Sequence, residues 1–271
     1  MHRIARIAIA ALASVGMLAS VAACGSGQST SEKNGTIEVA ASVNQWGTVA
    51  KALGGDNVNV TSIINSTNVD AHDYEPTTSD IAKLQKAQVI IVNGAGYDAW
   101  AVKAAQTANA TIVNAAEVGG VNDGENPHVW FSADVRKAVA QAITEAYEQA
   151  DAAKKNDFDK MNDQWAAEEN NVESKIAEVK QKTDGLAYAA TESVASYLAE
   201  DMGLADATPS GYARATANES EPTPTDIKQF TDALKAGEIK LLVVNTQEES
   251  ELTDKITDAA KSVEEIGRAH V

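Results

Sequence analysis

The sequence predicts an α/β fold made of two α/β lobes with mainly parallel sheets, joined by a long rigid helix. Short apolar runs alternate with amphipathic segments over the first part of the chain, which indicates strands and helices in turn. A purely helical pattern then extends from Ser132 to about Lys182, and the alternation returns after it. We therefore expect a first lobe at residues 36–150, a linker helix at 151–182 and a second lobe at 183–271.

The first lobe contains four apolar runs that predict strands and two amphipathic segments that predict helices. Thr77 stands just before the first of these helices and Asp80 follows three positions later, which is the pattern of a capped helix start. The strands are expected at Thr36–Val43, Val58–Ile64, Val89–Val92 and Thr111–Val113, and the helices at Ile81–Lys86 and Trp100–Thr107.

The helical stretch after Ser132 is expected to break near Asp151–Asp157. Its second part, Phe158–Lys182, contains no Gly or Pro and would extend roughly 35–40 Å at about 1.5 Å per residue. In the second lobe, strands are expected at Leu186–Thr191 and Lys240–Asn245, with a helix near Thr225–Lys235 between them.

The N-terminal segment indicates export. Residues 1–6 carry two arginines, residues 7–18 are apolar but too few to span a bilayer, and small residues lead to Cys24. The end of this segment, Val21–Cys24, resembles a bacterial lipobox, and Cys24 is the only cysteine. We expect a signal peptide at 1–24, a lipid such as palmitate on Cys24, and a flexible tether at 25–35 that holds an extracytoplasmic protein on the bacterial cell membrane.

The charge of the chain narrows the choice of partner. A formal net charge of −17 at pH 7 argues against nucleic acid, whose phosphates need Lys and Arg. A cation is the better match, although diffuse acidity more often indicates only a solvated surface.

Two of the four histidines are expected inside the folded body. His2 belongs to the leader and His270 to the extreme tail, whereas His72 and His128 stand in polar loops that precede helices. Ligand sites of α/β folds gather in such loops, but a single loop histidine is ordinarily a surface residue.

Three segments carry a resemblance to a known family: Asp70–Leu84 with an H-x-Y-E-P signature, Asn93-Gly94, and Asn126–Trp130 with an N-P-H-x-W signature. In order and spacing, the chain from Thr36 to Val263 resembles the metal-binding solute-binding proteins of zinc and manganese ABC importers. The resemblance implies two α/β lobes with the metal site in the cleft between them.

The resemblance also implies the ligands. The histidines of both signatures, His72 and His128, would bind the metal, and Glu192 stands where the family places its third ligand. A carboxylate beside two imidazoles shifts preference from Zn²⁺ toward Mn²⁺, yet both remain open. Without the histidines, Glu192 would be an exposed residue at a helix start.

Further acidic and amide residues could support these ligands. Glu75 lies inside the first signature, and Asn245 either supports a ligand or only ends a strand. Glu219 and Glu221 resemble a polar loop near the cleft in manganese-type members, although ordinary surface is the simpler interpretation.

The C-terminal tail departs from the family pattern. The family's fourth ligand is an Asp late in the second lobe, and residues 265–271 do not continue toward it. We expect these residues to be foreign, a translated sequencing adapter, with the chain truncated before the fourth ligand. Resequencing that returned the same residues followed by a stop codon would contradict this.

The predicted function is capture of Mn²⁺ or Zn²⁺ as a transported ligand, without an organic cofactor, and delivery to an ABC permease and its ATPase. We expect a monomer that is not an enzyme. One alternative is an extracellular metal-dependent hydrolase, since His, His and Glu with an open position can activate water. It is disfavoured because no compact catalytic signature is present. A metal-binding surface adhesin is the other alternative.

Overall fold

The computed structural model describes residues 35–66, 69, 71–72, 74–248, 250–263 and 266–271. The predicted signal peptide, the lipidation of Cys24 and the tether up to residue 34 lie outside the described residues. Within the described part, no helix has both the length and the apolar composition needed to cross a membrane.

The first lobe is built on a four-stranded parallel sheet with strand order β2-β1-β3-β4. All four predicted strands are confirmed, at β1 (Ile37–Val43), β2 (Val58–Ile64), β3 (Val89–Val92) and β4 (Thr111–Asn114). The helices are α1 (Asn44–Gly54), α2 (Thr78–Lys86), α3 (Ala99–Ala105) and α4 (Ala115–Val118).

Helices cover both faces of this sheet. The strand β3 is apolar throughout because both of its faces are buried. Val89 and Ile91 pack into one core with Trp46 of α1, whereas Ile90 and Val92 pack into a second core that includes Leu84 of α2. Successive strand residues point to opposite faces, so a strand covered on both sides contains no polar position.

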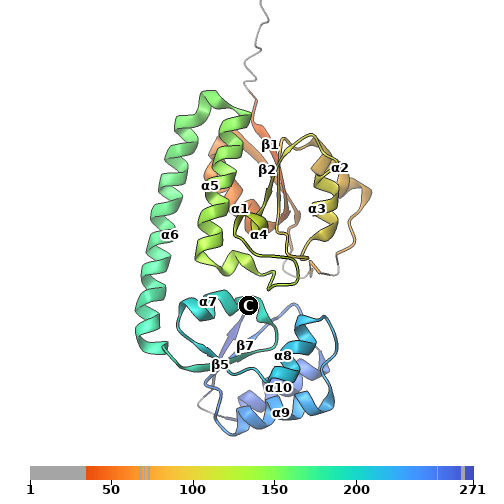
Figure 1. Ribbon diagram of the computed structural model, residues 1–271, viewed down its shortest axis with the longest axis vertical. Coiled ribbons are helices and arrows are strands. Elements are labelled where there is room, and N and C mark those ends of the chain that lie inside the picture. Colours follow the sequence, from red (N-terminus) through yellow and green to blue (C-terminus); the bar gives the residue numbers. More distant parts are fainter. Residues whose placement is uncertain (1–34, 67–68, 70, 73, 249, 264–265) are drawn as a thin grey trace, which may run out of the picture. The chain divides into compact units, whose positions relative to one another are not determined.

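The predicted break in the long helical stretch is confirmed. Helix α5 (Ala133–Ala150) ends at Asp151, a short 3-10 turn follows at Ala152–Lys154, and α6 (Lys155–Thr183) then continues for 29 residues. Helix α6 packs on α5 and contacts α7 (Ser196–Asp201) of the second lobe (Figure 1). The long helix therefore connects the two lobes, as predicted.

The second lobe repeats the parallel arrangement, with strand order β6-β5-β7-β8. Its strands are β5 (Ala187–Ala190), β6 (Ala205–Asp206), β7 (Leu241–Val244) and β8 (Gly267–His270). The remaining helices are α8 (Ser210–Ala217), α9 (Pro224–Lys235) and α10 (Glu251–Lys261), and the lobe's main core lies between these helices and the sheet.

The prediction that His270 lies outside the folded body is wrong. The structure places His270 in β8, where it is paired with Val244 of β7. Ile266 is buried next to the strand, and the main-chain N–H of Val271 donates to the carbonyl of Val244 at 3.0 Å. A strand can pair through main-chain groups whatever its side chains are, which is why this tail joins the sheet.

Candidate metal centre

His72 is held in a loop that is tied to the start of α2. The predicted cap is present, because the Thr77 side chain accepts from the main-chain N–H of Asp80 and the Asp80 carboxylate accepts from that of Thr77. The hydroxyl of Tyr74, two residues after His72, donates to the same carboxylate at 2.8 Å. The hydrogen bond from the Thr77 hydroxyl lowers the pKa of Asp80 far below its usual range and outweighs the effect of burial.

The His72 ring lies at the wall of the cleft. Its side chain is 18% exposed, and its Nδ1 lies 3.4 Å from a carboxylate oxygen of Glu219, which comes from the second lobe. The ring of Tyr97 packs edge-on against it, with ring centroids 4.7 Å apart. His72 is therefore held by groups from both lobes.

His128 is buried and held by its own loop. The Asn126 side-chain oxygen accepts from the main-chain N–H of His128 at 3.1 Å and lies 2.7 Å from its Nδ1. The other ring nitrogen, Nε2, lies 3.2 Å from a carboxylate oxygen of Glu192. One side of the imidazole thus faces the first lobe and the other faces the second.

A buried polar cluster fixes the loop that precedes His128. The Asn93 side-chain amide donates to the carbonyl of Pro127 at 2.9 Å, and Trp46 Nε1 donates to the Asn93 side-chain oxygen at 2.9 Å. Asp98 accepts from the main-chain N–H groups of Asn93 and Gly94. Burial raises the pKa of Asp98, and these hydrogen bonds offset part of the increase.

The backbone conformation at Gly94 accounts for the glycine that follows Asn93 in the sequence. Its φ is +79°, a conformation that glycine adopts without strain. A Cβ atom at this position would also lie 2.1 Å from the side-chain oxygen of Asn114. Both the backbone conformation and the available space require glycine here.

Glu192 is the potential metal ligand that comes from the second lobe. It follows β5 in an extended conformation, and its side chain is 12% exposed. The side-chain amide of Asn245 donates to its second carboxylate oxygen. Burial alone would raise the pKa of Glu192, but the hydrogen bonds from His128 and Asn245 and the nearby imidazoles lower it overall.

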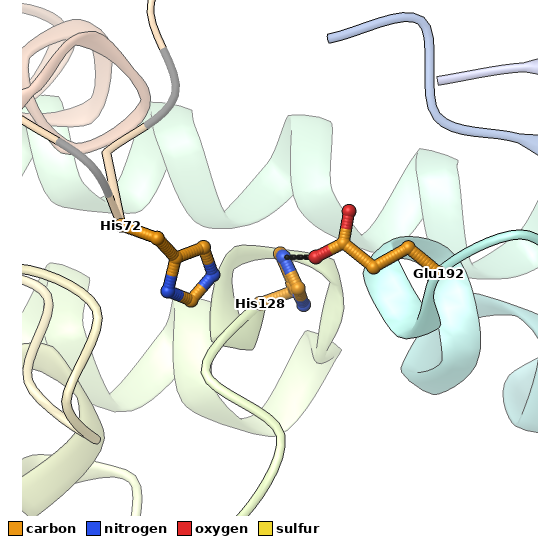
Figure 2. A group of neighbouring side chains, drawn as sticks. All are labelled: His72, His128 and Glu192. Carbon is orange, nitrogen blue, oxygen red and sulfur yellow. Dashed lines mark ion pairs between the residues drawn. The ribbon is translucent and has the colours of Figure 1, made fainter. Parts of the chain in front are cut away.

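The three predicted ligands converge. Their potential donor atoms all lie within 4.8 Å of one another, and Figure 2 shows the side chains of His72, His128 and Glu192 directed toward one another from separate segments. Nitrogen and oxygen donors at about 2.1 Å from a tetrahedral ion lie about 3.4 Å apart, so a small contraction would suffice to bind one. The residues line a cleft of about 410 Å³.

The predicted supporting residues have different positions. Asn245 lines the cleft and contacts Glu192, whereas Glu75 is exposed and is absent from the described lining. Glu219 is mostly exposed, yet one of its carboxylate oxygens lies 3.4 Å from Nδ1 of His72. His270, expected to be remote, lines the same cleft from β8.

Sequence reasoning missed two features of the site. Trp130 and Tyr97, to which the sequence assigned no role of their own, form the aromatic wall around His128, with ring centroids 5.4 and 5.7 Å from it. The second feature is the role of Asn126, which the sequence shows only as part of a signature, although an amide two residues before a histidine can hydrogen-bond to its ring.

Two α/β lobes with parallel sheets, joined by one long helix, are the architecture of a solute-binding protein. A family model described as zinc-uptake complex component A, periplasmic, matches residues 39–269, so the chain belongs to that family of metal ABC transporter substrate-binding proteins. These are binding proteins and not enzymes, which removes the hydrolase alternative.

Individual relatives agree with this assignment. The manganese ABC transporter substrate-binding lipoprotein PsaA of Streptococcus anginosus is 24% identical, covering 83% of this chain and 77% of its own length. The iron ABC transporter substrate-binding lipoprotein MtsA of Streptococcus pyogenes serotype M1 is 26% identical, covering 79% and 73%. The periplasmic zinc-binding protein TroA from Treponema pallidum has the same fold, with a TM-score of 0.73 at 14% identity and 88% coverage of both chains.

Proposed function

We propose that this protein captures Mn²⁺ or Zn²⁺ through His72, His128 and Glu192 and delivers the ion to an ABC permease driven by an ATPase. The observation that supports the proposal is the convergence of two imidazoles and one carboxylate within 4.8 Å of one another, from loops of both lobes. Imidazole and carboxylate donors suit borderline divalent ions such as these.

The environment of the donors supports ion binding. Asn245 contacts the carboxylate of Glu192, and Asn126 contacts His128, as expected for groups that orient metal ligands. The pKa of Glu192 is lowered, which keeps the carboxylate ionised and able to ligate.

Delivery to a permease requires a location outside the cytoplasm. The lipobox-like segment that ends at Cys24 supports anchoring to the bacterial membrane through a lipid, and PsaA and MtsA carry the name lipoprotein. We propose that the protein acts there as a monomer.

Calorimetric titration of the tag-free protein with Zn²⁺ and with Mn²⁺ tests the ligand set. We expect His72→Ala, His128→Ala and Glu192→Ala each to weaken binding more than about tenfold, since even loss of an outer partner has about that effect. Glu200→Ala, an exposed acid in the same lobe, is the control and should bind normally. Unchanged affinity in the three ligand variants would refute the site.

The choice of ion is tested by Glu192→His. Replacing the carboxylate oxygen with a third imidazole should favour Zn²⁺ over Mn²⁺, because the softer nitrogen donor suits zinc better. If the ratio of the two affinities does not change, Glu192 does not set the selectivity.

A further inference from the structure

The ring of Tyr97 packs against both histidines of the first lobe. It meets His72 edge-on, with ring centroids 4.7 Å apart and ring planes at 86°, and it meets His128 at 5.7 Å and 67°. The two imidazoles also contact each other, with centroids 5.9 Å apart, so the three rings form a triangle. Tyr97 is only 6% exposed, and it is therefore a buried part of the cleft wall.

The backbone just before Tyr97 is strained. Gly94, Ala95 and Gly96 have φ values of +79°, +50° and +85° in succession. Glycine adopts such values freely, whereas alanine does so only at a cost, and Glu219 is the only other non-glycine residue with a positive φ among those described. Strain of this kind persists where the surrounding structure enforces it, and it is concentrated at functional sites.

A buried carboxylate holds this strained turn in place. Asp98 has the N-cap position of α3, but its side chain makes no capping hydrogen bond to that helix. Its two carboxylate oxygens accept instead from the main-chain N–H groups of Asn93 at 2.7 Å and Gly94 at 2.9 Å. The main-chain N–H of Tyr97 donates to the Gly94 carbonyl at 3.0 Å and closes the turn. The position of Tyr97 is therefore fixed from within the first lobe.

The loop of His128 is attached to the same turn. The side-chain amide of Asn93 donates to the carbonyl of Pro127, the residue before His128, at 2.9 Å. The ring of Trp130 packs on Tyr97, with centroids 5.1 Å apart, and on His128 at 5.4 Å. One buried segment of the first lobe thus places both the Tyr97 ring and the histidine beside it.

We propose that Tyr97 is a positioning residue that sets the separation and orientation of the two imidazoles before an ion binds. The first lobe then carries a preformed half-site of two histidines. The inference rests on the proposed function, since it takes His72 and His128 as ligands. Donors that are already held in place lose less freedom when they bind an ion, and this raises affinity. Without the Tyr97 ring, both imidazoles gain room to turn.

Substitutions at Tyr97 separate the effect of the ring from that of the hydroxyl. Tyr97→Phe keeps the ring, whereas Tyr97→Leu removes it. Tyr97→Met is a second variant without the ring, and its flexible side chain fills irregular space, so it carries the test should Tyr97→Leu not fold. Phe158→Leu is the control for general loss of packing, because it removes a fully buried ring that packs on Tyr147 in the core of the same lobe.

The mobility of the imidazoles is measured without metal, from ¹³C NMR relaxation of the ring Cε1–H groups in histidine-labelled protein at one fixed pH. Spectra of His72→Ala and His128→Ala give the assignment. We expect ordered rings in the wild type, Tyr97→Phe and Phe158→Leu, and increased motion of both rings in Tyr97→Leu and Tyr97→Met. Wild-type order of the two rings in the variants that lack the Tyr97 ring would overturn the proposal.

Binding of Zn²⁺ and Co²⁺ provides the second measurement. We expect Tyr97→Leu and Tyr97→Met to bind Zn²⁺ about 10–100-fold more weakly, in the range typical for loss of a group that orients a ligand. The visible spectrum of bound Co²⁺ reports the coordination geometry and should change in the same two variants. Phe158→Leu should lower Tm but keep the wild-type zinc affinity and cobalt spectrum, as should Tyr97→Phe without the loss of Tm.

The outcomes for Tyr97 and for the proposed function are distinct. Wild-type zinc affinity and cobalt spectrum in both variants without the ring would show that Tyr97 only packs, and would overturn the inference. A wild type that fails to bind Zn²⁺ would instead refute the proposed function, and the metal-free relaxation measurement would still decide whether Tyr97 orders the two imidazoles.

Discussion

Both imidazoles of the site have an oxygen beside Nδ1, and the two oxygens come from very different parts of the chain. Asn126 stands two positions before His128, so its role follows from local sequence once the signature is known. Glu219 reaches His72 from the loop after α8 in the other lobe. No local pattern connects these two residues, which is why sequence analysis favoured an ordinary surface position for Glu219.

At the residue scale, Asn245 provides a first prediction. Its amide donates to the Glu192 carboxylate, while its main-chain N–H is held by the Thr191 hydroxyl at 3.0 Å, so the backbone contact survives truncation of the side chain. We expect Asn245→Ala to weaken Zn²⁺ binding about 10–100-fold without unfolding the lobe. Calorimetric titration measures this, with Asn171→Ala on the exposed surface of α6 as the control. Equal affinities for the two variants would show that Asn245 only ends its strand.

At the element scale, strands and caps were predictable because their signals are local. Apolar runs marked β1 to β4, and Thr77 with Asp80 marked the start of α2. Helix α1 was missed: its buried face consists mainly of Trp46, Ala50 and Leu53, and it begins directly after β1 without a side-chain cap. Neither a run of apolar residues nor a capping signal separates it from the strand.

The cap of α2 makes stability depend on pH. The pKa of Asp80 is lowered in the folded protein, so its charge stabilises the fold fully above about pH 4, the value for an unfolded Asp. That contribution is lost as the pH falls from there toward the folded-state pKa. We expect Asp80→Asn to reduce the free energy of unfolding by about 1 kcal/mol at neutral pH. Its deficit should shrink in acid.

Urea unfolding at pH 7 and at pH 3 measures the change. The matched control is Asp226→Asn, in the second Thr–Asp capping box at the start of α9. Asp226 lacks the contacts to Lys83 and Tyr74 that Asp80 has, so its variant should show the weaker pH dependence. A deficit for Asp80→Asn that stays constant with pH would contradict the assignment.

The contact between α5 and α6 gives another prediction at this scale. Arg136 contacts Glu169 through two nitrogens and donates to the Trp130 carbonyl at 3.0 Å, and its side chain is 16% exposed. Removing one partner of a buried ion pair costs about 3–5 kcal/mol, whereas an exposed pair contributes about 0–1 kcal/mol. We therefore expect Glu169→Ala to be far more destabilising than Glu173→Ala. Glu173 pairs with Lys137 and is more exposed than Glu169.

Chemical denaturation of both variants checks this, and Arg136→Met combined with Glu169→Leu separates pairing from packing. The double variant should recover most of the lost stability, because no unpaired charge remains buried. If Glu169→Ala and Glu173→Ala lose equal stability, the buried pair has no special role in fixing the long helix.

At the scale of the whole molecule, the two-lobed architecture was predictable and the composition of the cleft only partly so. The alternation of apolar and amphipathic segments and the long helix define the lobes. The resemblance to metal-binding proteins named His72, His128 and Glu192, which the structure brings together. Pairing of the C-terminal tail with β7 depends on main-chain groups, and therefore the sequence did not indicate that His270 would reach the cleft.

In the proposed site, donors from both lobes would make a bound ion a crosslink for the molecule. Because the ion binds only the folded arrangement, Zn²⁺ at about 100 times its Kd should stabilise the protein by about 2.7 kcal/mol. Ligating imidazoles must be neutral, and free histidine protonates near pH 6.5, so the stabilisation should be much smaller at pH 5.5 than at pH 7.5. Differential scanning calorimetry with and without Zn²⁺ measures the rise in Tm at each pH. Mg²⁺, which prefers oxygen ligands and retains its waters, should give little rise. An equal rise in a His72→Ala, His128→Ala double variant would place the stabilising ion elsewhere on this acidic chain.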